Sequence, residues 1–117
     1  MIHAVSLSGG KDSTAMLLMM IEKRMQIDRI IFVDTTKEYP QLYKHLEKLQ
    51  KYIKPYQIET VKLDWNYWFY EHDKSQSKWA GKYRYEPGYG WPHWKQRWCT
   101  AIKTNAVQCM LAYGEYN

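Results

Sequence analysis

The sequence predicts an α/β domain built on a parallel sheet, because short buried strands alternate with helices along its first half. Residues 2–7, 30–33 and 57–63 are short runs of apolar and β-branched side chains, the pattern of strands covered on both faces. Between them, residues 14–24 and 40–53 carry leucine, methionine and isoleucine in helical patterns. Strands that alternate with helices imply right-handed crossovers and a parallel sheet.

The predicted helices have recognisable ends. Asp12 and Ser13 are expected to cap the first helix, because their side-chain oxygens accept hydrogen bonds from first-turn amides. Pro40 suits the first turn of the second helix. A third helix is predicted over residues 100–112, where Gly114 supplies the stop.

The alternation breaks at residues 65–98, which contain all six tryptophans together with several glycines and prolines. We interpret this stretch as a long insertion with one short helix near Trp68. So many aromatic side chains argue against disorder, so we expect a folded lid over the open edge of the sheet or a self-association surface. A homodimer through residues 65–98 is favoured. Stacking on nucleic-acid bases, which interleaved aromatic and basic residues permit, is a less favoured alternative.

Composition narrows the class of protein. A chain of 117 residues predicts one domain, residues 1–117, and its net charge of +5 favours anionic partners such as nucleotides. Without a basic leader or a membrane-length apolar run, we expect a cytoplasmic protein that does not enter membranes. Two cysteines are too few for a disulfide framework or for a complete iron–sulfur site within one chain.

Residues 8–13, between the first strand and the first helix, predict a phosphate-binding loop. Gly9 and Gly10 are expected to adopt unusual backbone angles and to let the main chain approach an anion. Unpaired amides at the start of a helix attract phosphate, and Lys11 adds a positive charge. The pattern is neither the Walker A loop nor the dinucleotide fingerprint. The predicted nucleotide-binding residues of this loop are Ser8, Gly9, Gly10, Lys11, Asp12 and Ser13.

The loop Ser-Gly-Gly-Lys-Asp-Ser resembles the signature of the PP-loop, or N-type, ATP pyrophosphatases. Two further segments narrow the resemblance to the phosphoadenosine phosphosulfate (PAPS) reductase-like family. Residues 32–40 resemble its second motif, and residues 97–103 resemble its third. The resemblance extends over residues 2–103 and implies a three-layer α/β/α domain of the adenine nucleotide α-hydrolase-like fold.

The resemblance also implies roles for residues outside the loop. Asp34, at the carboxyl end of the second strand, would contact the nucleotide or Mg²⁺ with Thr35 beside it, although a turn or capping role for Asp34 is equally expected. Arg97 and Lys103 would hold a second anionic group, such as a sulfate. Glu38 is expected to cap the second helix or to form a salt bridge there. The implied catalytic residues are Lys11, Asp12, Arg97 and Lys103.

The resemblance implies that the chain cleaves the α,β-phosphate bond of ATP to adenylylate an acceptor, with Mg²⁺, or binds PAPS-like nucleotides. Two departures qualify this expectation. Thr36 stands where the family usually has glycine, and the Glu-Cys-Gly motif of the reductases is absent, which disfavours PAPS reduction by this chain alone. The alternatives are a nucleotide-binding or sensor module without turnover, and a subunit of a larger, nucleic-acid-modifying assembly.

Overall fold

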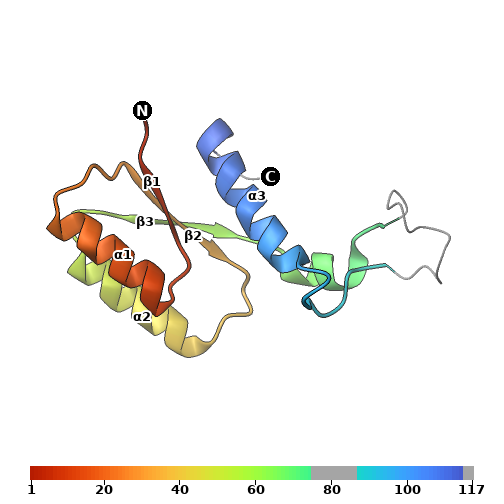
Figure 1. The fold of residues 1–117 in the computed structure, drawn as a ribbon. Helices are drawn as coiled ribbons and strands as arrows, with labels where there is room; N and C mark the ends of the chain where they lie inside the picture. Colours follow the sequence, from red (N-terminus) through yellow and green to blue (C-terminus); the bar gives the residue numbers. More distant parts are fainter. Residues whose placement is uncertain (75–86, 115–117) are drawn as a thin grey trace.

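A computed structural model describes residues 1–74 and 87–114 and confirms the predicted α/β architecture (Figure 1). Strands and helices alternate up to the end of the third strand, as the apolar patterns predict. A π-helical turn and a long helix follow. The elements are β1 (Ala4–Leu7), α1 (Lys11–Glu22), β2 (Arg29–Asp34), α2 (Pro40–Tyr52), β3 (Ile58–Lys62), η1 (Tyr67–Glu71) and α3 (Trp98–Tyr113).

The three strands form one parallel sheet in the order β1-β2-β3. Ile30 of β2 pairs with Val5 of β1 on one side and with Ile58 of β3 on the other. Because the strands are parallel, their carboxyl ends share one edge of the sheet, and the segments after β1 and β2 meet there. This edge is where open α/β sheets bind their ligands.

Helices cover both faces of the sheet, which confirms the three-layer prediction (Figure 1). Side chains of β2 alternate between the two layers: Ile30 packs with Leu17 of α1 and Leu49 of α2. Ile31, its neighbour, faces the other layer, where it packs with Ile102 of α3. This alternation explains why β2 reads as a continuous apolar run in the sequence.

Helix α3 runs antiparallel to the strands and is tied to the sheet at its C-terminal end by Arg29. The Arg29 guanidinium donates to both carboxylate oxygens of Glu59, at 3.0 and 2.6 Å, and to the carbonyl oxygen of Met110 at 2.7 Å. The hydrogen bonds from Arg29 lower the pKa of the Glu59 carboxyl. With its end held there, α3 begins at the carboxyl edge of the sheet.

The structure corrects the expectations about the cap of α1 and about the start of α3. Helix α1 begins at Lys11 with Gly10 as its N-cap, so neither Asp12 nor Ser13 caps it. The Ser13 hydroxyl points back to the loop instead, where it accepts a hydrogen bond from the Ser8 amide at 3.3 Å. Helix α3 begins at Trp98, two residues before the predicted start.

The described parts of the aromatic segment, 65–74 and 87–98, pack against the layer formed by β2, β3 and α3. The predicted short helix near Trp68 is confirmed as the π-helix η1. The lid is expected over the open edge of the sheet beside the strand that carries the phosphate loop, which is β1. The described parts pack with residues of β2, β3 and α3 and with none of β1, so they do not form this lid. Residues 75–86 lie outside the described residues, and the homodimer remains a prediction. No described helix is long and apolar enough to cross a membrane.

Candidate functional site

The loop between β1 and α1 depends on one glycine more than on the other. Gly9 has φ of +80° and is packed under α2, where an added Cβ would lie 2.7 Å from Cδ1 of Leu42. Gly10 has φ of −75°, an ordinary value, and an added Cβ would meet only the Ser8 hydroxyl at 3.5 Å. The expectation of unusual backbone angles therefore holds for Gly9 and is wrong for Gly10.

Two serines brace the loop from within. The hydroxyls of Ser8 and Ser13 lie 2.9 Å apart, and the Gly10 amide donates to the Ser8 hydroxyl at 3.3 Å. No side chain caps α1, so the amides of its first turn stay open to a ligand. The exposed side chains of Lys11 and Asp12 flank these amides. The arrangement offers several N–H donors and one positive charge to an anion.

A cavity of about 280 Å³ lies beside this loop, between the ends of β1 and β2 and the inner side of α3. Hydroxyl groups from both sides line it, together with one ammonium group. The residues of this polar cavity that carry such groups are Ser6, Ser8, Thr100, Lys103 and Thr104. Sequence reasoning missed the two threonines of α3, although their spacing of four residues places them on one face of a helix.

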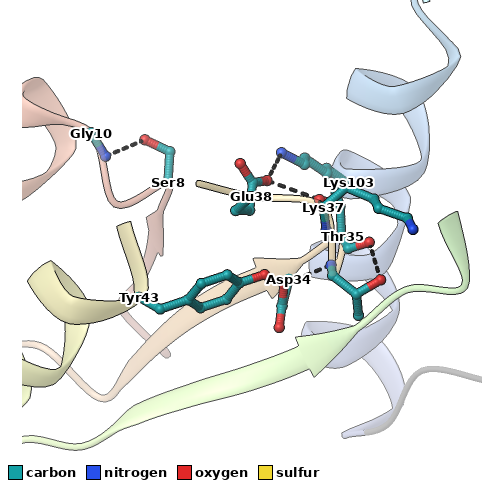
Figure 2. Close-up of polar contacts among 9 residues, drawn as sticks. Ser8, Gly10, Asp34, Thr35, Lys37, Glu38, Tyr43 and Lys103 are labelled. Atoms are coloured by element: carbon teal, nitrogen blue, oxygen red, sulfur yellow. Dashed lines mark hydrogen bonds and ion pairs between the residues drawn. The ribbon is translucent and has the colours of Figure 1, made fainter. Parts of the chain in front are cut away.

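Asp34 occupies the predicted place at the carboxyl edge, with 7% of its surface exposed. Its Oδ1 accepts hydrogen bonds from the Thr36 amide and from the Tyr43 hydroxyl, both at 2.7 Å (Figure 2). The bond to the Asp34 carboxylate raises the pKa of Tyr43, so the phenol stays protonated. Asp34 thus has the turn role that the sequence also allows. Among the described residues, no donor forms a hydrogen bond to its Oδ2. The sequence motifs did not point to Tyr43 as a partner of Asp34.

Thr36 adopts φ of +64°, a left-handed backbone conformation that is rare for a β-branched residue. Its hydroxyl donates to the carbonyl oxygen of Thr35 at 2.6 Å. Glycine reaches this conformation without steric cost. The geometry therefore explains why a glycine is usual at this position of the motif and marks Thr36 as a strained substitute.

Glu38 forms the expected salt bridge before α2, and its partner is Lys103 of α3, with Nζ to Oε1 at 3.0 Å (Figure 2). The Thr35 hydroxyl donates to the same Oε1 at 3.0 Å. Thr35, which is buried, and Glu38 therefore hold the Lys103 ammonium at the carboxyl edge of the sheet. The motifs gave no sign of this pairing, because its members lie 65 residues apart.

Arg97 and Lys103 do not line the same cavity. Lys103 lines the cavity beside the phosphate loop, whereas Arg97 lines a cavity on the other side of α3. The two cavities share no residue of the helix. In this conformation the two cations therefore face different ligand spaces.

The residues at the carboxyl edge fit a magnesium ion that is carried by a nucleotide. Within the described ranges, no three acidic, histidine or cysteine side chains are grouped to hold a metal ion. Mg²⁺ needs no such group, because it is commonly held by one or two carboxylates and the substrate's phosphates. Asp34, with one unengaged carboxylate oxygen, is the carboxylate available at this edge. Asp12, which is predicted to contact the nucleotide, lines a separate cavity along α1 with Met16 and Met19.

A glycine loop of this form, after the first strand of a parallel sheet with helices on both faces, defines an adenine nucleotide α-hydrolase-like domain of the PP-loop class. Comparison with family models identifies the family within that class: the model of the phosphoadenosine phosphosulfate reductase domain matches residues 2–115. The chain belongs to this family. No curated protein and no solved structure matches it.

Proposed function

We propose that the chain binds an adenine nucleotide at the carboxyl edge of the sheet, with the phosphates on the loop of residues 8–13. The observation that carries the proposal is the form of this loop. Gly9 brings the main chain close under α2, two serines brace the turn, and the first-turn amides of α1 have no side-chain cap. Such amides together with the dipole of α1 bind phosphate.

The remaining predicted residues contribute according to their positions. Lys11 would neutralise phosphate charge from the open side of the loop. Lys103 would reach a further anionic group through the cavity that it shares with Ser8. Asp34 would hold the ribose or Mg²⁺ through its unengaged oxygen, and Thr35 would act by positioning Glu38.

The chemistry that suits this site is adenylyl transfer from ATP. An acceptor oxygen attacks the α-phosphorus, the bond from that phosphorus to the α,β-bridging oxygen breaks, and pyrophosphate leaves while AMP stays on the acceptor. The acceptor's proton goes to solvent. The loop amides and Lys11 would stabilise the charge that develops on pyrophosphate, so no side chain needs to act as a covalent nucleophile. A bound Mg²⁺ would supply further charge neutralisation.

Isothermal titration calorimetry with ATP tests the binding site. Lys11→Ala should weaken ATP binding by about 1.5–3 kcal/mol, the value of a hydrogen bond between charged groups. Lys44→Ala removes an exposed lysine of α2 that lines none of the cavities described above and is the matched control. Equal ATP affinity in the wild type and in Lys11→Ala would refute the phosphate-loop assignment.

Turnover is measured separately, as pyrophosphate released from ATP with and without Mg²⁺. Mg²⁺-dependent release that Lys11→Ala abolishes would support adenylyl transfer. Tight ATP binding without release would contradict adenylyl transfer to water, the acceptor present in this assay, and would favour the nucleotide-binding module. Mass spectrometry of nucleotides that co-purify with the protein distinguishes ATP, AMP and PAPS as ligands.

A further inference from the structure

A second cavity, of about 490 Å³, lies on the side of α3 that faces away from the phosphate loop. The proposed nucleotide site does not use it. Aromatic rings form one part of its wall, and amide and guanidinium side chains form another. The residues that define this aromatic cavity are Trp68, Tyr89, Gln96, Arg97, Trp98 and Asn105.

The rings of the aromatic cavity are nearly parallel. The planes of Trp68 and Tyr89 differ by 11°, with their centroids 6.3 Å apart. The planes of Tyr89 and Trp98 differ by 19°, with centroids 6.0 Å apart. Trp98 is buried, whereas Trp68 and Tyr89 remain half-buried along the cavity. A planar ligand ring can extend such a set by stacking on it.

The main chain holds these rings in place. Three consecutive amides of the loop before α3 donate to carbonyl oxygens of η1 and the residue that follows it, at 2.9–3.0 Å: Gly88 to His72, Tyr89 to Trp68, and Gly90 to Phe69. Gly88 has φ of +76°, and an added Cβ would collide with the Phe69 carbonyl group. The Trp98 indole N–H donates to the carbonyl oxygen of Gly90 at 2.9 Å. The wall is therefore ordered before any ligand arrives, and π-helices such as η1 are frequent at functional sites.

The rim of the aromatic cavity is positively charged. Arg97 is exposed and stands at the N-cap of α3, where the helix dipole adds positive potential. In the described part of the chain, its guanidinium forms no ion pair, unlike Arg29 and Lys103. A guanidinium binds a carboxylate, sulfate or phosphate through two parallel hydrogen bonds.

We propose that the aromatic cavity binds a planar aromatic ring that carries an anionic group, with the ring on Trp68 and Tyr89 and the anion on Arg97. This proposal does not rest on the proposed function, because the aromatic cavity and the phosphate loop share no residue.

Calorimetry with 1-naphthyl phosphate, 1-naphthol and inorganic phosphate tests the two parts of the ligand separately. The titrations use the Lys11→Ala variant, so that the phosphate loop contributes less to the binding. Naphthyl phosphate should bind more tightly than either fragment, by about tenfold or more. Affinity for naphthyl phosphate no higher than for inorganic phosphate would overturn the proposal.

Arg97→Gln should lower the affinity for naphthyl phosphate to that for naphthol, a loss of about tenfold or more. Lys95→Gln removes a neighbouring cation that lies over Trp94, outside the aromatic cavity, and should leave the affinity unchanged. Ala101→Phe should abolish binding, because Ala101 lines the aromatic cavity from the exposed side of α3. Unchanged thermal unfolding shows that each variant is folded.

Naphthyl phosphate binding that survives both Arg97→Gln and Ala101→Phe would refute the proposal. The outcome is separable from that of the proposed function. If Lys11→Ala leaves ATP binding unchanged while Arg97→Gln weakens naphthyl phosphate binding, the phosphate-loop assignment fails and the aromatic cavity stands as a binding site.

Discussion

The strained backbone at Thr36 makes a prediction about stability that is independent of any ligand. Thr36→Gly removes the Cβ from a left-handed conformation, with φ of +64°, that costs an L-residue about 1–2 kcal/mol. The substitution also has an entropic cost that reduces this gain in stability, because ordering glycine on folding costs about 0.5–1 kcal/mol more than ordering alanine. The hydroxyl bond from Thr36 to the adjacent Thr35 carbonyl is local and adds little. We expect a net stabilisation of about 0.5–1 kcal/mol.

Urea unfolding followed by circular dichroism measures this change, with the midpoint raised and the slope unaltered. Thermal unfolding should shift upward by about 2–4 °C for a chain of this size. The matched control is Thr60→Gly, the same substitution in the extended backbone of β3, where glycine destabilises. If Thr36→Gly destabilises the protein as much as Thr60→Gly does, strain at Thr36 is refuted.

Three further predictions concern the loop, the α3 anchor and self-association. Gly9→Ala should abolish ATP binding in calorimetry and lower the unfolding midpoint, whereas Gly10→Ala should leave that midpoint unchanged. Arg29 lowers the folded-state pKa of Glu59, so this pair stabilises the protein above pH 4.5, and the stabilisation is lost as the pH falls through the lowered pKa. In Glu59→Gln, the urea midpoint should therefore fall less steeply as the pH is lowered below 4.5. We expect a dimer with residues 65–98 at its interface, which light scattering should show as twice the mass of the chain. A measured mass of 14.2 kDa, that of a monomer, at high micromolar concentration would contradict the dimer.

The sequence predicted the fold because its signals are local. The apolar runs of β1, β2 and β3 and the proline at the start of α2 act within a few residues, as does the glycine loop. The partner of Glu38 has no such local signal, since Lys103 lies on a helix that reaches the site only through tertiary packing. The sequence shows that Thr36 stands where the family usually has glycine, but it does not show that the backbone of Thr36 is left-handed.

The separation of Arg97 from Lys103 follows from the start of α3. Placing that start at residue 100 left Arg97 in a loop, free to join Lys103 on one anion. Once α3 begins at Trp98, Arg97 becomes its N-cap and is carried by the turn of the helix. Arg97 lines the aromatic cavity with Ala101 and Asn105, whereas Lys103 lines the cavity beside the phosphate loop with Thr100 and Thr104.

The two cations of α3 also differ in how readily they can meet a ligand. Lys103 is already paired with Glu38, at 39% and 24% exposure of the two side chains. An ion pair this exposed is worth about 0–1 kcal/mol, so a phosphate or sulfate that enters the cavity beside the loop can draw the ammonium from Glu38 at little cost. Arg97 has no ion-pair partner to give up among the described residues. If both proposed sites bind their ligands, Lys103 would exchange Glu38 for an anionic group of the nucleotide, and Arg97 would bind the anionic group in the aromatic cavity. One helix would then serve two anionic groups without their competing for a cation.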